Sequence, residues 1–344
     1  MAVTARGLAK AAEILAGQFT LVATNVPYLG RNKQDDVLME FCETNYGHAK
    51  ADLATCFGER CISFCSPGGT KAEVTQQSWL FQPRYESLRE ATLRNSRFEI
   101  LVRLGEHAFE SSDAAGAFVV LQVISNVMPT KSSAFLGLDV AGYPTPKEKA
   151  DSLLNSSASS VSQERQLQNP ESRITIDEIE SGIARLSDKA DCYQGLRTGD
   201  REQYVCNFWE VVEHHPVWDF IRTCADGEGQ GGHSHVVLWQ GGKGRLADFA
   251  AKNRDKLHDM HESGNRAWGK RGVAFGQLRS LPRSVYSGDK FDNSVAVVFP
   301  KREQDLPAVV AFCLSDTFIP EVRKLNQGLY VTNATFVKVP FELV

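Results

Sequence analysis

What the chain lacks excludes several classes of protein. Its 344 residues contain no apolar run as long as the roughly 18 residues that a membrane-spanning helix needs. The first 16 residues carry two basic side chains and no apolar signal core, so they predict an ordinary amphipathic helix. No internal repeat is present. We therefore expect a cytoplasmic globular protein without a membrane partner, large enough for two domains.

Cysteine and histidine patterns do not indicate a metal site. The eight cysteines include no Cys-x-x-Cys pair, which is the usual spacing of zinc and redox sites. Cys61 and Cys65 are four residues apart in a helical pattern and suit a buried helix face. The histidines form loose pairs without cysteine or carboxylate partners at ligand spacing. We expect reduced, structural cysteines and no metal.

The net charge of −4 does not indicate a nucleic-acid binder, but the charge is uneven. Residues 243–283 contain ten Lys and Arg against four Asp and Glu, a local balance of +6. A local basic surface matters more for phosphate contact than the total charge. A solvated helical face would produce the same pattern.

Strand and helix patterns alternate through residues 1–150 and predict an α/β layer with a largely parallel sheet. We expect strands at 19–24, 71–75, 98–104 and 117–124, and helices around 37–41, at 52–64 and at 85–93. Pro67, Gly68 and Gly69 should end the helix at 52–64. The last two strands could form a hairpin at the sheet edge.

The alternation then stops. Residues 151–170 begin with a polar, serine-rich stretch that predicts a linker. Residues 171–344 hold short mixed elements and all but one of the tryptophans. We therefore expect a first domain over 1–150, a linker over 151–170 and a second domain over 171–344.

The tetrapeptide Asn25-Val26-Pro27-Tyr28 directly follows the first predicted strand. Ligands in open α/β sheets bind outside the carboxyl ends of strands. The Asn25 side-chain oxygen and the Val26 carbonyl could accept hydrogen bonds from the two N–H groups of an amine conjugated to a ring. The amine nitrogen would then regain a lone pair that can react. Pro27 would stiffen the turn, and Tyr28 would stack on the ring. An ordinary strand followed by an Asn-x-Pro turn gives the same four residues.

The segment 22–34 resembles the catalytic motif of gamma-class adenine-N6 DNA methyltransferases, above all the type IIG restriction-modification and BREX phage-defence enzymes. Their usual motif is Asn-Pro-Pro-Tyr, and Val26 replaces its first proline. That position supplies a backbone carbonyl, so the acceptor survives the change. Segments 51–60, 67–69 and 74–81 resemble the next helix, its cap and the following strand and loop.

The resemblance also implies further site residues. Segment 104–109 is similar to the family loop whose aromatic packs on the other face of the flipped base, which implies Phe109; a core aromatic is the alternative. Segments 195–199, 239–245, 268–273 and 329–340 resemble the target-recognition region, so Lys243, Arg245, Lys270 and Arg271 become candidate contacts to double-stranded DNA.

Enzymes of this family use S-adenosylmethionine, held by strands that lie upstream of the catalytic strand. Only 18 residues precede Phe19, so the resemblance implies an N-terminally truncated methyltransferase without its cofactor-binding motif. A second chain carrying the missing half is a candidate partner. The glycine-rich segment 226–232 could be a permuted cofactor loop, but a strand rather than a helix is predicted after it, which favours a loop of the recognition region.

We therefore predict the C-terminal half of a Rossmann-like methyltransferase sheet followed by a mixed α/β recognition region. By resemblance its role is S-adenosylmethionine-dependent methylation of adenine N6 in DNA, with the isolated chain inactive. The alternatives are a non-catalytic DNA-binding or interaction fragment, and methylation of RNA adenine or a glutamine side chain.

Overall fold

The computed structural model describes residues 2–110, 116–177, 179, 182–211, 217–223 and 233–341, with side chains from Arg6 onward. The chain divides into two compact units, residues 1–181 and 182–344. Among the described residues, no helix is both long enough and apolar enough to cross a membrane.

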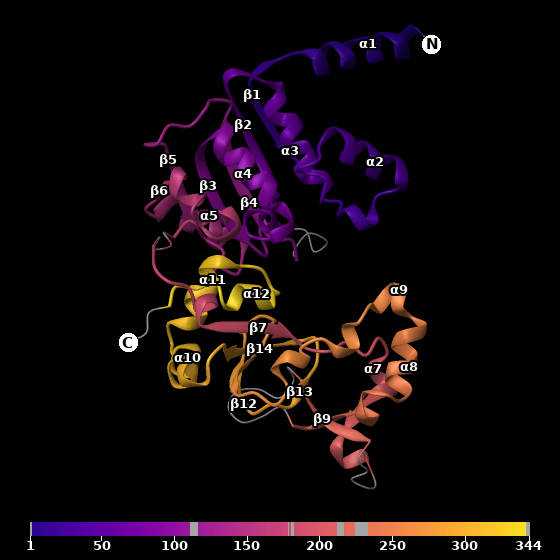
Figure 1. Cartoon of the computed structure of the whole chain (residues 1–344). Coiled ribbons are helices and arrows are strands. Elements are labelled where there is room, and N and C mark those ends of the chain that lie inside the picture. Colours follow the sequence, from indigo (N-terminus) through magenta and orange to yellow (C-terminus); the bar gives the residue numbers. More distant parts are fainter. Residues whose placement is uncertain are drawn as a thin grey trace. The chain divides into compact units, whose positions relative to one another are not determined.

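The first unit is built on one six-stranded mixed sheet (Figure 1). Its strands are β1 (Phe19–Asn25), β2 (Cys65–Gln76), β3 (Arg97–Gly105), β4 (Val119–Ser125), β5 (Ala134–Asp139) and β6 (Ser159–Ser162). They lie in the order β1-β2-β4-β3-β5-β6. β1, β2, β3 and β5 run in one direction, while β4 and β6 run against them. The predicted α/β class is confirmed.

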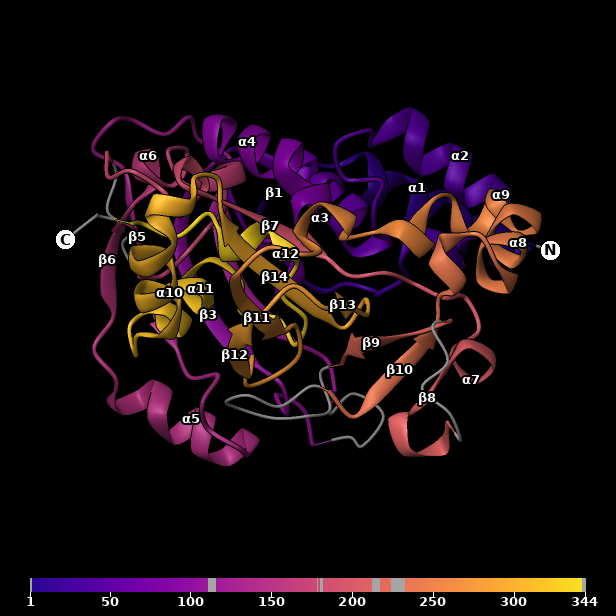
Figure 2. The same cartoon turned by 60° about the horizontal axis from the view of Figure 1, so that its bottom comes forward.

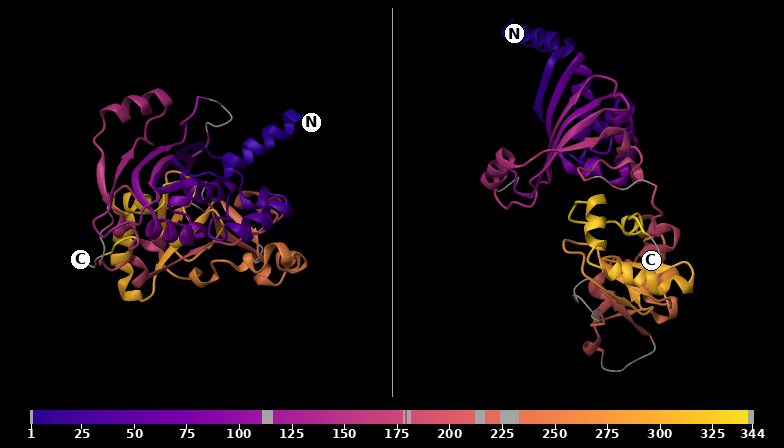
Figure 3. Two further views of the ribbon diagram at one scale, coloured as in Figure 1. Left: turned by 90° about the horizontal axis from the view of Figure 1, so that it is seen from above. Right: turned by 90° about the vertical axis from the view of Figure 1, so that its left-hand side faces the viewer.

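The helices of the first unit are α1 (Ala2–Ala16), α2 (Asp36–Asn45), α3 (Leu53–Phe64), α4 (Glu86–Asn95), α5 (Pro146–Asn155) and α6 (Gln163–Gln166). In the right-hand view of Figure 3, α3 and α4 lie along one face of the sheet. The apolar core lies between this face and the helices. Trp79 stacks on Phe98 at a centroid distance of 6.3 Å, and Phe98 contacts Phe135.

Three expectations from the sequence are corrected by this topology. The hairpin of β3 and β4 forms, but in the middle of the sheet, because β4 also pairs with β2, and β3 also pairs with β5. Pro67 to Gly69 do not end a helix. They belong to the first part of β2, where Gly68 has φ +80° and the register with β1 shifts. Residues 151–170, expected as a linker, hold the end of α5, β6 and α6, and β6 completes the sheet.

A buried arginine ties the end of the first unit to its core. Arg89 on α4 is fully buried, and its Nη1 donates to the carbonyls of Trp79 at 2.7 Å and Gln82 at 2.9 Å. Its Nη2 donates to the Glu171 carbonyl at 2.8 Å. Burial and the nearby Arg173 cation lower the pKa of Arg89 to about 10. Residues near 171 therefore belong to the first unit.

β1 forms an open edge of this sheet, since it pairs with β2 on one side only among the described strands. Its apolar side chains are poorly covered: Leu21 is 61% exposed and Phe19 is 39% exposed. An exposed apolar edge strand is a ready template for pairing with another strand.

The second unit contains two four-stranded sheets, in the orders β13-β9-β10-β8 and β12-β11-β14-β7 (Figure 2). The strands are β7 (Ala190–Gln194), β8 (Val205–Asn207), β9 (Trp218–Arg222), β10 (His235–Leu238), β11 (Gly272–Gly276), β12 (Arg283–Tyr286), β13 (Lys290–Phe291) and β14 (Val295–Pro300). The helices are α7 (Arg201–Tyr204), α8 (Arg245–Lys252), α9 (Arg254–Leu257), α10 (Leu306–Leu314), α11 (Phe318–Leu325) and α12 (Asn333–Phe336). The mixed α/β character predicted for this region is confirmed. The glycine-rich segment 226–232 lies outside the described residues.

Candidate active site and basic surface

The tetrapeptide after β1 is fixed by β2 and by the start of α3. The Val26 amide donates to the Val74 carbonyl at 3.4 Å, and the Val26 side chain is buried. The Leu29 amide donates to Asp52 Oδ1 at 3.2 Å. The same oxygen accepts the Ala54 amide at 2.9 Å and so caps α3. One carboxylate thus holds both the helix and the loop.

The chemical groups of the loop face outward. Asn25 is exposed, and Tyr28 is 37% exposed. Among the described residues, nothing donates to the Asn25 side chain or to the Val26 carbonyl oxygen, so both acceptors remain available. Burial, together with the negative charges of Glu73 and Asp52, raises the pKa of Tyr28 to about 12. The phenol ring therefore stays neutral at any physiological pH.

Phe109 follows β3 at the same edge of the sheet as the tetrapeptide. β1 and β3 run in the same direction. Gln76 of β2 and Gly105 of β3 pair with the same residue of β4, and Asn25 of β1 pairs with Val74 of β2, so the three strands end at nearly the same level. Three inter-strand steps separate Asn25 from Gly105, which is about 14 Å. Phe109 lies four residues beyond and is half-buried. The placement is compatible with a stacking role, which stays a prediction.

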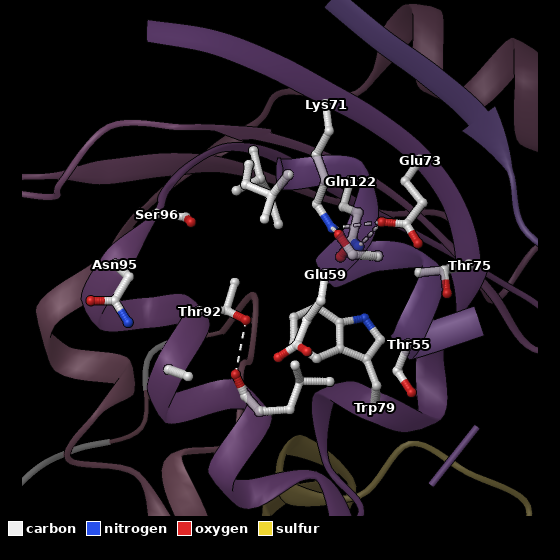
Figure 4. Close-up of a pocket in the computed structure, with 15 residues that line it drawn as sticks. Thr55, Glu59, Lys71, Glu73, Thr75, Trp79, Thr92, Asn95, Ser96 and Gln122 are labelled. Carbon is white, nitrogen blue, oxygen red and sulfur yellow. Dashed lines mark hydrogen bonds and ion pairs between the residues drawn. The ribbon is translucent and has the colours of Figure 1, made fainter. Parts of the chain in front are cut away.

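A buried polar network supports the strand behind the loop (Figure 4). Lys71 Nζ lies 2.7 Å from Glu73 Oε2, and Gln122 Nε2 donates to the same oxygen at 2.9 Å. Lys71 also donates to the Gly58 carbonyl of α3 at 3.0 Å. The sequence does not predict this network, because a Lys-x-Glu alternation in a strand normally indicates a solvated face. Only the apolar residues around it could have indicated burial.

Two of the four predicted DNA contacts lie at the start of α8. Lys243 and Arg245 are exposed, and the turn before the helix is shaped by Gln240, whose Oε1 accepts the Arg245 amide at 2.8 Å. Cations at a helix N-terminus add charge to backbone amides that already attract anions. Their side chains are available for phosphate.

The other two predicted DNA contacts precede β11, and each of them already has a partner within the protein. Lys270 Nζ lies 4.4 Å from the centroid of the Phe299 ring. Arg271 forms an ion pair with Glu303. Both residues are exposed, but the Arg271 charge is partly neutralised where it stands.

Comparison with known proteins places the first unit in a family context. Residues 5–109 match the family model described as Eco57I restriction-modification methylase. Over 96 residues, 28% of this chain, it is 36% identical to the adenine-specific methyltransferase BrxX of Escherichia coli O9:H4 (strain HS). Over 153 residues, 43% of the chain, it is 31% identical to the adenine-specific methyltransferase PglX of Lacticaseibacillus casei (strain Zhang). The family resemblance seen in the motifs is confirmed for this part of the chain.

The matched parts are small pieces of these relatives: they cover 8% of BrxX and 12% of PglX. A solved type IIL restriction-modification enzyme, MmeI in complex with DNA, superposes with a TM-score of 0.61 at 13% identity. That alignment covers 92% of this chain and 45% of MmeI. The DrdV–DNA complex gives a TM-score of 0.50 at 10% identity, covering 87% of this chain and 38% of DrdV. These likenesses concern the fold of both units.

Proposed function

We propose, starting from the match of residues 5–109 to the Eco57I methylases, that this chain serves in methylation of adenine N6 in DNA. The system would be one of restriction-modification or BREX-type phage defence, in keeping with its BrxX and PglX relatives. The observation that carries the proposal is the anchored tetrapeptide, whose two uncommitted acceptors stand at the carboxyl end of β1. The second unit would read the DNA.

The tetrapeptide activates the amine of a flipped adenine by accepting both of its N–H bonds. Asn25 Oδ1 accepts a hydrogen bond from one N–H group, and the Val26 carbonyl accepts one from the other. The nitrogen lone pair is then less delocalised into the ring. Pro27 holds φ fixed between the two acceptors and the aromatic residue. Tyr28 stacks on one face of the base, and Phe109 on the other. Because both acceptors are preset, little reorganisation is needed when the amine becomes tetrahedral.

S-adenosylmethionine, when bound, would supply the methyl group from its sulfonium. The described residues at this edge of the sheet do not form a glycine-rich turn, so they do not fit a complete cofactor site. We propose that a further strand pairs with the open edge of β1 and brings that site. The exposed Leu21 and Phe19 support this, because a neighbouring strand and its helix would cover them.

The decisive experiment measures methyl transfer to DNA by the chain together with the segment that completes its sheet. Asn25→Ala should reduce transfer by about a hundredfold or more, as removal of a preorganised transition-state partner does elsewhere. DNA affinity should stay within about twofold, since contacts to phosphates dominate the affinity of proteins for DNA and Asn25 is uncharged. Asn45→Ala is the matched control, because among the described residues the Asn45 side chain donates only to the Phe41 carbonyl on α2.

Equal transfer by the wild type and Asn25→Ala would remove the tetrapeptide from the mechanism. No transfer to DNA by the completed protein, combined with salt-sensitive DNA binding, would favour the non-catalytic alternative. Transfer to RNA or to a protein glutamine instead of DNA would keep the chemistry and overturn the substrate.

A further inference from the structure

A pocket of about 240 Å³ opens in the second unit beside the segment 195–199, and residues 196–199 form one of its walls. The first residue of α7, the first residue of β8 and residues 292–293 supply the rest of the wall. A water molecule needs roughly 10–15 Å³ of such space. The pocket can therefore hold a group much larger than one solvent molecule.

Two glycines fix the course of the segment 195–199. A side chain at Gly195 would place its Cβ 2.1 Å from the Phe291 carbonyl oxygen, far too close for a real contact. Gly199 has φ +78°, a left-handed conformation that other residues rarely adopt. The chain between the two glycines is therefore held in one path, and it presents Arg197 and Thr198 at a fixed place.

The pocket carries hydrogen-bond donors that the described part of the protein does not use. Arg197 is exposed, and its guanidinium forms no ion pair among the described residues. Thr198 is only 8% exposed, yet its hydroxyl has no hydrogen-bond partner there. That hydroxyl is not among the enclosed polar atoms, so it is accessible from the pocket. The side-chain amide of Asn293 likewise has no partner among the described residues.

The charge balance of the pocket favours an anion. Its described wall holds one carboxylate, Asp292, and both oxygens of that group are already used. One lies 2.7 Å from Arg201 Nη1, and the other accepts the Ser294 amide at 2.9 Å. Arg197 therefore adds a positive charge that no group of the wall neutralises. A guanidinium beside a hydroxyl and an amide suits the oxygen atoms of a phosphate diester, which only accept hydrogen bonds.

The pocket lies next to the start of α8, where Lys243 and Arg245 are exposed (Figure 1). Arg201 of the pocket wall begins α7, and Tyr204 ends it. The Tyr204 ring contacts Phe249 of α8 at a centroid distance of 5.5 Å, and its hydroxyl donates to the Arg245 carbonyl at 3.4 Å. The pocket and the two candidate DNA contacts at α8 therefore belong to one cationic stretch of the second unit.

We propose that this pocket binds a phosphate group of a DNA strand, with Arg197 and Thr198 as its main ligands. The inference rests on the proposed function, because it takes DNA as the partner of the second unit. The Arg197 guanidinium supplies the charge and paired N–H donors, and the Thr198 hydroxyl donates one hydrogen bond to a phosphate oxygen. Contacts to phosphate position a protein on the duplex without reading its sequence. The segment 195–199 thus anchors the DNA that the rest of the unit reads.

Fluorescence anisotropy of the full chain with a labelled DNA duplex tests the proposal, measured at several salt concentrations without a methyl donor. Arg197→Ala should weaken binding by about tenfold, because one charge-assisted contact is lost. It should also reduce the slope of log affinity against log salt concentration by about 0.9, whereas Arg197→Lys should keep the slope. Thr198→Val has nearly the same shape. It should weaken binding by about threefold without changing the slope, because the hydroxyl is uncharged.

Lys324→Ala is the control for total charge, because it removes one positive charge from α11, outside the pocket wall. Circular dichroism checks the folding of each variant. Unchanged DNA affinity in Arg197→Ala and Thr198→Val overturns the proposal. So does an effect of Lys324→Ala equal to that of Arg197→Ala, or the absence of DNA binding by the folded wild type.

Calorimetry with inorganic phosphate separates the two sources of a phosphate group. Saturable phosphate binding that Arg197→Ala removes, with DNA affinity unchanged, would assign the pocket to a free phosphate and overturn its assignment to DNA. Failure of the methylation proposal gives a different result. A chain that binds DNA through Arg197 and Thr198 but transfers no methyl group, even with its sheet completed, keeps this inference and loses the proposed reaction.

Discussion

At the scale of single residues, Tyr28 links the tetrapeptide that we propose to be catalytic to the interior of the first unit. Its ring is partly exposed, yet its hydroxyl feels the charges of Glu73 and Asp52, and its pKa rises to about 12. A free tyrosine ionises near pH 10. Because the phenolate form of Tyr28 is disfavoured, the ring that we propose to stack on the base stays neutral at physiological pH.

The role of Tyr28 can be separated into ring and hydroxyl. Tyr28→Phe should keep methyl transfer within about threefold, whereas Tyr28→Ala should lower it by about tenfold or more, since stacking of one base contributes about 1–3 kcal/mol. The rate of methyl transfer to one DNA substrate, measured between pH 7 and pH 10, should have the same pH dependence in the wild type and in Tyr28→Phe. A larger loss in Tyr28→Phe than in Tyr28→Ala would contradict stacking.

The place of the tetrapeptide at the end of β1 can be predicted from the sequence. Asn25 to Tyr28 follow a short apolar strand, and both facts are visible in one stretch of sequence. Lys71, Glu73 and Gln122 cannot be predicted in this way, because the network joins β2 to β4 and α3, and its burial depends on helices packed above it. The pocket drawn in Figure 4 cannot be predicted from the sequence either, because its walls come from several separate elements.

At the scale of elements, boundaries agree with the sequence wherever an apolar pattern is strong. β1, α3, α4, β3 and β4 lie within a residue or two of expectation. β6 falls inside the expected linker, because an edge strand with exposed serines needs little apolar character. The start of β2 departs from expectation because Pro67 and Gly68 are typical of helix ends, and here they form an irregular strand start instead.

Asp52 offers a test of how an element's end supports the site. Asp52→Ala removes the cap of α3 and the bond to the Leu29 amide, and it should lower the free energy of unfolding by about 1–2 kcal/mol. Methyl transfer should fall as well, because the loop loses an anchor. Urea unfolding and transfer assays measure the two effects.

The matched control is Asp35→Ala, which removes the cap of α2 through Leu38 without touching the tetrapeptide. It should lower stability by about 0.5–1 kcal/mol and leave transfer unchanged. Equal effects of the two variants on transfer would mean that the loop does not depend on Asp52.

At the scale of the whole molecule, the net charge of −4 hides a local cationic surface in the second unit. Lys243→Ala and Arg245→Ala should weaken DNA binding by a similar factor on all sequences. Each should also reduce the slope of log affinity against log salt concentration by about 0.9 for every phosphate that the protein no longer neutralises. Fluorescence anisotropy at several salt concentrations measures both.

Arg271→Ala should change affinity less than Arg245→Ala, because the Arg271 guanidinium is already paired with Glu303. Glu303→Gln should in turn strengthen binding slightly by releasing that charge. An unchanged salt slope in Lys243→Ala and Arg245→Ala would place the DNA elsewhere on the molecule.

The hydrogen bonds of Arg89 have a consequence for synthesis on the ribosome. Its guanidinium needs the Glu171 carbonyl, which is made 82 residues later. Domains fold as units while the chain emerges, at about 5–20 residues per second. Until residue 171 leaves the exit tunnel, Arg89 has the Trp79 and Gln82 carbonyls as acceptors but lacks the third one, the Glu171 carbonyl. A nascent chain stalled anywhere between Arg89 and Glu171 should therefore be a chaperone substrate, and a gene division that respects the folding unit falls near residue 181.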